Sequence, residues 1–176
     1  MSVLDRFSLK GKVVLLTGGA GIYGRGLTRD VAEAGAKLII ASRNVEALQK
    51  VADEENERGY DVSVESLDQG DATSVKALCA RLKEKFGRID GLVNNAVARP
   101  MTGAKNMAEE LEHSMSINAT GMMVLTTEVG EIMSAQGSGS IVNIGSIMGM
   151  IGTNKYIYEG TGMKHSPDYF FHKGGM

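Results

Sequence analysis

The 176-residue chain has little of several features that point to particular classes of protein. Its one cysteine, Cys79, excludes an internal disulfide, and we expect a buried thiol in a reduced, cytoplasmic protein. A formal net charge of -2 gives no electrostatic reason to bind nucleic acid or an anionic membrane. No apolar run approaches a membrane span, the N-terminus lacks a signal-peptide core, and the three histidines lack metal-ligand spacing. These absences favour a cytoplasmic globular protein with small-molecule partners and no metal.

Apolar runs alternate with longer amphipathic segments along the whole chain. We expect strands at 12–17, 37–41, 61–67, 89–94 and 140–144, and helices at 23–34, 45–58, 74–86 and 107–136. No linker divides the chain. The alternation therefore predicts one α/β domain over residues 1–176, a Rossmann-type doubly wound parallel sheet with helices on both faces. The glycine-rich stretch 145–168 is expected to be a long loop, which in a compact domain is usually functional.

A glycine-rich turn joins the first expected strand to the first expected helix. Gly19, Gly21 and Gly24 satisfy the pattern G-x-G-x-x-G. Glycines at this spacing allow a tight turn, close backbone approach to a pyrophosphate, and close packing of helix on strand. The phosphates then meet free N–H groups at the positive end of the helix. A glycine-rich turn can also be only a turn, but the strand before it and the helix after it favour a dinucleotide site.

The end of the second expected strand bears on the choice of cofactor. NAD-binding folds place an acidic residue there to bind the ribose 2′-hydroxyl, whereas this chain has the acid-free sequence Ala41–Asn44. Arg43 can bind a 2′-phosphate bidentately, with Ser42 and Asn44 donating beside it, although a solvated arginine at a strand end is the alternative. The sequence therefore predicts NADP(H) in preference to NAD(H).

From about Leu9 to its last residue the chain resembles the short-chain dehydrogenase/reductase family. The turn matches the family's T-G-x-x-G-x-x-G loop, with Ile22 where the commoner version has glycine, and Asn94-Asn95-Ala96 resembles its N-N-A-G motif, with Val97 in the last place. The resemblance implies that Asp68 meets the adenine amino group. Together these motifs give the expected cofactor-binding residues, which are Gly18, Gly21, Tyr23, Gly24, Ser42, Arg43, Asn44, Asp68, Asn95 and Lys173.

The same resemblance implies a catalytic set of Asn118, Ser146, Tyr169 and Lys173. Tyr169 is the only tyrosine of the chain that has a lysine four residues later. On a helix the two share a face, where the ammonium favours the phenolate needed for proton transfer. The family resemblance adds a bond from Lys173 to the nicotinamide ribose, a hydrogen bond from Ser146 to the substrate oxygen, and a relay water held by Asn118.

Two features depart from the family pattern. The interval from Ser146 to Tyr169 is long, and we expect its extra residues, 158–168, to form a loop facing the substrate; an inert surface insertion is the alternative. The chain also stops just after the expected start of the helix at Tyr169, as in a truncated member. We therefore expect that helix to fray, the sheet edge to stay open, and cofactor binding with little turnover.

Two classes of function stay open on the sequence alone. The first is an NAD(P)-dependent oxidoreductase acting on an alcohol or carbonyl, with polyols, sugar acids and 3-oxoacyl thioesters as candidate substrates. The second is a catalytically inactive dinucleotide-binding fragment or interaction module. The family resemblance also implies a homo-oligomer, either a dimer or a tetramer.

Overall fold

The computed structural model describes residues 4–152, 154–164 and 166–176, so His165, one of the three histidines, lies outside the described residues. Five parallel strands form one sheet in the order β3-β2-β1-β4-β5. This confirms the predicted doubly wound α/β fold. The strands are β1 Val13–Thr17, β2 Lys37–Ser42, β3 Asp61–Ser66, β4 Gly91–Asn94 and β5 Ser140–Asn143.

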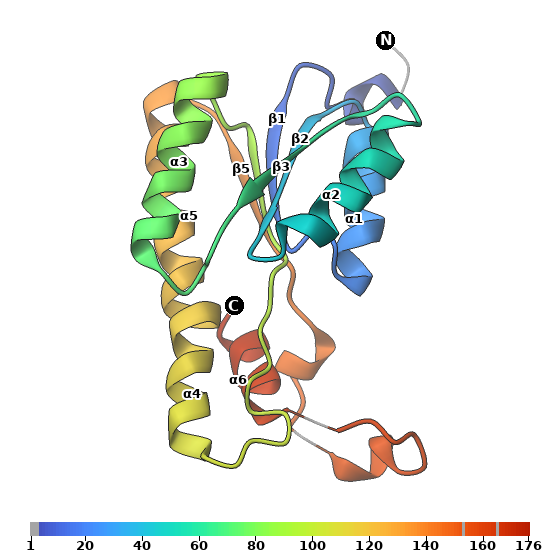
Figure 1. The fold of residues 1–176 in the computed structure, drawn as a ribbon, viewed down its shortest axis with the longest axis vertical. Coiled ribbons are helices and arrows are strands. Elements are labelled where there is room, and N and C mark those ends of the chain that lie inside the picture. The colour runs from blue at the N-terminus through green and yellow to red at the C-terminus, as the bar shows by residue number, and fades with distance from the viewer. Residues whose placement is uncertain (1–3, 153, 165) are drawn as a thin grey trace.

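Helices cover both faces of the sheet (Figure 1). They are α1 Ile22–Glu33, α2 Val45–Asn56, α3 Ala72–Phe86, α4 Met107–Met115, α5 Met122–Gln136 and α6 Pro167–Gly175. Side chains alternate along the strands, so that Leu15 and Ile39 enter a core under α3 and α5, while Leu16 and Ile40 enter a second core under α1 and α2. Asn44 is the N-cap of α2, and its side chain accepts a 3.0 Å hydrogen bond from the backbone N–H of Ala47.

The expected long helix at 107–136 is interrupted. A π-helical turn, η2 (Ser116–Gly121), separates α4 from α5. Such turns free backbone carbonyls inside a helix, and here the Ile117 carbonyl accepts a 3.0 Å hydrogen bond from the side chain of Gln69. The sequence pattern missed this break because η2 contains no proline and keeps the apolar spacing of its neighbours.

The segment expected to be an irregular loop contains two short 3-10 helices, η3 (Ile147–Gly149) and η4 (Lys155–Tyr158). It leads into α6, which begins at Pro167, two residues before Tyr169. The predicted fraying of α6 is not what the structure has, because Asp168, Phe170, His172 and Lys173 are all buried. The helix is therefore held by tertiary packing.

Among the described residues no strand pairs with the outer edge of β5, so this edge of the sheet is open, as predicted. At this edge Ile141 and Val142 are 37% and 48% exposed. At the carboxyl ends of the strands, α4, α6 and the segment between β5 and α6 extend beyond the sheet (Figure 1). Among the described residues, no helix combines the length and the apolar character needed to cross a membrane.

Candidate functional site

The glycine-rich turn lies at the carboxyl end of β1 and begins α1. A Cβ atom on Gly24 would overlap the carbonyl of Gly18, so only glycine lets the helix come this close to the turn. Gly21 is the N-cap and provides no side-chain bond to the first turn of α1. The N-terminus of α1 therefore has no side-chain cap, which leaves its backbone N–H groups available to a phosphate.

The residues after β4 are joined to this turn by hydrogen bonds. Thr17 is fully buried, and its hydroxyl oxygen accepts from the backbone N–H groups of Asn95 and Ala96 at 3.1 and 3.0 Å. The Asn95 amide donates to the carbonyl oxygens of Thr17 and Gly18 at 2.9 and 3.2 Å. Asn95 therefore fixes the shape of the turn, which is a structural role beside the cofactor contact that the sequence predicts.

A cavity of about 740 Å³ opens over the turn. Every predicted cofactor-binding residue except Lys173 lines it. The buried side chain of Gln69 also lines it, and its Oε1 atom has no hydrogen-bond partner among the described residues. A turn too close for a Cβ, an uncapped helix end and an unsatisfied acceptor together fit a dinucleotide.

A second cavity, of about 500 Å³, contains both Ser146 and Tyr169 in its lining. The Ser146 oxygen accepts from the backbone N–H of Met148 at 3.1 Å, which leaves its proton to donate elsewhere. A Cβ on Gly149 would overlap the carbonyl of Lys173, so the 3-10 turn that follows Ser146 lies directly against α6. The structure thus brings the predicted serine and tyrosine to one cleft.

Arg99 is a residue of this region that sequence analysis missed. Its guanidinium carbon lies 4.1 Å from the centroid of the Tyr169 ring, within the range of a cation–π contact. Arg99 lines the cofactor cavity as well as the cleft. The available signal was its place, four residues after Asn95, in the segment that follows the N-N-A motif.

Lys173 is buried behind Tyr169. Its ammonium lies 5.9 Å from the centroid of the Tyr169 ring and donates to the carbonyl of Ile144. Burial lowers the pKa of Lys173, and the nearby charge of Arg99 lowers that pKa further. Lys173 lines neither cavity, so the shared helix face with Tyr169 is present, while the ribose bond stays a prediction.

The side chain of Asn118, in η2, is buried and takes part in three hydrogen bonds. Its Oδ1 accepts from the Ala98 N–H at 2.8 Å, and its Nδ2 donates to the Ala98 carbonyl at 2.8 Å and to Ser114 Oγ at 3.1 Å. These bonds position the segment that carries Arg99. Both N–H groups of the amide and one of the two lone pairs of Oδ1 are therefore used, and the relay water at Asn118 stays a prediction.

Behind the cleft lies a buried polar cluster that the sequence did not suggest. Ser114 Oγ is 2.8 Å from Asp168 Oδ2 and 3.0 Å from His172 Nε2. Because Ser114 has one proton and two lone pairs, it donates to the carboxylate and accepts from both Asn118 and a His172 ring protonated at Nε2. Asp168 also accepts from Ser166 Oγ and from the Tyr169 N–H. This Ser114 cluster (Ser114, Asn118, Asp168 and His172) joins α4, η2 and α6.

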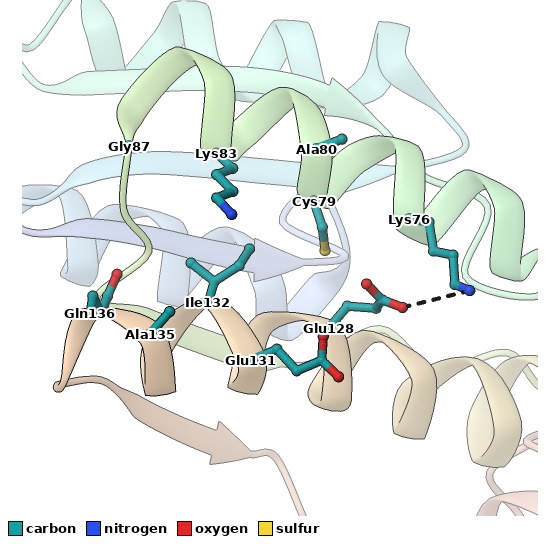
Figure 2. A pocket seen from close by; sticks show the side chains of 10 residues that line it. All are labelled: Lys76, Cys79, Ala80, Lys83, Gly87, Glu128, Glu131, Ile132, Ala135 and Gln136. Atoms are coloured by element: carbon teal, nitrogen blue, oxygen red, sulfur yellow. Dashed lines mark ion pairs between the residues drawn. The ribbon is translucent and has the colours of Figure 1, made fainter.

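A groove between α3 and α5 shares no lining residue with either cavity (Figure 2). Burial raises the pKa of the Cys79 thiol at its base to about 11, as expected for an inert cysteine. Lys76 and Glu128 pair across the groove at 3.9 Å. The lining of this groove includes neither the hydroxyl side chains of the cleft nor the glycine-rich turn of the cofactor cavity.

The fold and the glycine-rich turn define a Rossmann-type α/β protein in which Tyr169 lines a cleft that shares Arg99 with the cavity over the turn. The family model for short chain dehydrogenases matches residues 12–161. The chain therefore belongs to the short-chain dehydrogenase/reductase family, as the sequence motifs predicted.

The chain is similar to several dehydrogenases in sequence and in structure. It is 35% identical over 154 residues to an NADP-dependent mannitol dehydrogenase of Hypocrea jecorina, covering 85% of this chain and 58% of that protein. It is similar in structure to a gluconate 5-dehydrogenase from Burkholderia cenocepacia in complex with NADP and tartrate (TM-score 0.81, 29% identity, 98% of this chain, 64% of that one). It is also similar to an NAD+-bound xylitol dehydrogenase (TM-score 0.80, 27% identity, 94% of this chain, 61% of that one). The chain spans a little under two thirds of these proteins.

Proposed function

We propose that this chain is the cofactor-binding and proton-transferring part of an NADP(H)-dependent oxidoreductase that interconverts an alcohol and a carbonyl on a polyol or sugar acid. The observation that carries the proposal is that Ser146 and Tyr169 line one cleft, and that Arg99 lines both this cleft and the cofactor cavity. A substrate beside the tyrosine would therefore be next to the cofactor.

The roles of the side chains follow from their surroundings. The bound nicotinamide supplies or accepts the hydride. The Tyr169 hydroxyl delivers the proton that a developing alkoxide needs, and Ser146 donates a hydrogen bond to the same oxygen. Lys173, buried behind the ring, favours the phenolate when the proton has left. Asn118 holds the segment of Ala98 and Arg99 against the cleft.

The preference for NADP(H) rests on Arg43. It lines the cofactor cavity beside Ser42 and Asn44, and none of the ion pairs among residues 4–152, 154–164 and 166–176 includes it. Residues 41–44, at the end of β2, include no carboxylate that would repel a 2′-phosphate. The NADP-dependent mannitol dehydrogenase supports this choice, and the NAD+-bound xylitol dehydrogenase shows why it needs a direct test.

The test is a steady-state assay of the purified chain with NADP+ or NADPH, over alditols, aldonates, simple ketones and a 3-oxoacyl thioester. Turnover of the polyhydroxylated compounds supports the proposal, and turnover of the thioester alone would favour the reductase alternative. Saturable NADPH binding, measured by nicotinamide fluorescence, without turnover of any substrate would support the inactive dinucleotide-binding alternative instead.

A further inference from the structure

The cleft that contains Ser146 and Tyr169 has positive charge with no carboxylate to balance it. Two of its lining residues, Arg99 and Lys164, are cations, and no aspartate or glutamate lines it. Neither cation belongs to an ion pair among the described residues. Two acidic residues adjoin lining residues in the sequence: Asp168 is 1% exposed and already accepts hydrogen bonds from Ser114 and Ser166, and the exposed Glu159 does not line the cleft. A bound substrate would therefore meet an uncompensated positive field.

The two cations come from different segments, and both line the cleft. Arg99 follows β4, and its guanidinium lies over the face of the Tyr169 ring. Lys164 comes from the long segment before α6, and its ammonium lies 3.9 Å from the position of a Cβ built on Gly103, in the loop that follows Arg99. Among the described residues the Arg99 guanidinium takes part in no side-chain hydrogen bond or ion pair, so its N–H groups stay available for a planar anion.

We infer that the substrate carries an anionic group, in the first place a carboxylate, close to the reacting carbon, and that Arg99 binds it with help from Lys164. The inference rests on the proposed function and narrows it from polyols and sugar acids to acids. A guanidinium matches a carboxylate or a phosphate in bidentate geometry, so both are tested. The contact of Arg99 with the tyrosine ring places the anion beside the reacting carbon instead of at the end of a long chain.

The experiment compares matched substrates that differ only in charge. D-Gluconate and D-glucitol share carbon number and hydroxyl stereochemistry at carbons 2 to 5, and D-glucitol 6-phosphate tests the phosphate. We expect kcat/KM with NADP+ to favour the carboxylate over the alditol by about 10- to 100-fold, the range of a charge-assisted bidentate contact. A pair of L-threonate and L-threitol repeats the comparison on a shorter chain.

Arg99→Gln should remove most of that preference, so that the ratio of kcat/KM for the acid to kcat/KM for the alditol falls about 10- to 100-fold. Lys164→Gln should act in the same direction with a smaller effect. The matched control is Lys83→Gln, which removes a charge from the groove between α3 and α5. KM for the acid should also rise with added salt, whereas that for the alditol should not.

The outcomes separate this inference from the proposed function. Oxidation of alditols as fast as acids, with no effect of Arg99→Gln on the acids, would overturn the anion assignment and leave the oxidoreductase intact. If no compound is oxidised, binding decides, because D-gluconate should still change the fluorescence of NADPH bound to the chain, and Arg99→Gln should weaken that response about tenfold or more. If neither D-gluconate nor L-threonate nor D-glucitol 6-phosphate changes the fluorescence, the inference is wrong. A response to D-glucitol 6-phosphate alone would overturn the choice of a carboxylate as the anionic group.

Discussion

The hydroxyl of Ser114, at the end of α4, donates a 2.8 Å hydrogen bond to the carboxylate of Asp168, in the first turn of α6. Ser114 also accepts from Asn118, and Asp168 accepts from the backbone N–H of Tyr169. Two predicted catalytic residues are therefore linked through a serine and an aspartate that touch neither cavity. The relative placement of asparagine and tyrosine depends on this pair.

Ser114→Ala should lower kcat about 10-fold or more and leave the dissociation constant of NADPH unchanged, because a loosened α6 misplaces the tyrosine without touching the cofactor cavity. The buried Asp168 loses a donor, so the free energy of unfolding should fall by about 1–3 kcal/mol. Turnover and urea unfolding measure both effects. The control is Ser116→Ala, because the Ser116 hydroxyl donates to the His113 carbonyl and lies outside the Ser114 cluster. Wild-type kcat in Ser114→Ala would refute the positioning role.

Tyr169→Phe should reduce turnover by about 10²- to 10⁴-fold, the usual contribution of a proton-transferring group, while NADPH binds as before. Tyr169 lines the cleft and does not line the cofactor cavity. Tyr156→Phe is the matched control, since Tyr156 is 71% exposed and lines neither cavity. Retention of most activity in Tyr169→Phe would exclude this tyrosine as the proton donor.

Arg43→Asp should reverse the cofactor preference. The substituted carboxylate repels a 2′-phosphate and accepts hydrogen bonds from a free ribose, so NADPH should bind about 10-fold or more weaker and NADH more tightly. Dissociation constants from nicotinamide fluorescence give the ratio for each protein. The control is Arg25→Asp: Arg25 lies in α1, forms an ion pair with Glu54 and does not line the cavity. Equal affinities for NADH and NADPH in the unmodified chain would contradict the assignment to Arg43.

His172 makes stability depend on pH. Burial lowers the pKa of its imidazole below the ordinary 6.5, although the charge of Asp168 opposes that shift. Below pH 6.5 the unfolded chain therefore takes up a proton that the folded chain refuses, so stability falls as the pH drops from 6.5 toward the folded-state pKa. Urea unfolding at a series of pH values measures the slope. His172→Gln keeps a donor for Ser114 and should flatten the slope; an unchanged slope would exclude His172 as its source.

Asp90 should support stability without affecting the site. It precedes β4, accepts from the Val13 N–H at 2.9 Å and from the Arg88 guanidinium, and its pKa is lowered to about 2, chiefly by Arg88. Since 3.8 is its ordinary value, this stabilisation is present above pH 3.8 and is lost as the pH falls toward 2.

Asp90→Asn should lower the free energy of unfolding at pH 7 by about 1–3 kcal/mol and leave the affinity for NADPH unchanged. Asp61→Asn, at an exposed ion pair with Lys37, should change it by less than about 1 kcal/mol. Equal losses in the two variants would show that burial of Asp90 contributes nothing.

The sequence determined the fold class, the strand order along the chain, the cofactor turn and the family, because each rests on short contiguous patterns. Alternating apolar runs specify strands and helices locally. The glycines of residues 18–24 specify a tight turn between a strand and a closely packed helix. The family resemblance implied that Ser146 and Tyr169 belong to one catalytic set, and in the structure both line one cleft.

Only the tertiary structure decided how the side chains meet. Arg99 lies over the Tyr169 ring although 70 residues separate them, and Ser114 reaches Asp168 across 54 residues. The ammonium of Lys173 donates a hydrogen bond to the Ile144 carbonyl, and the amide of Asn118 forms hydrogen bonds with Ala98 and Ser114. Local patterns do not contain such pairings, because a buried polar group takes whichever partner the folded chain brings within reach.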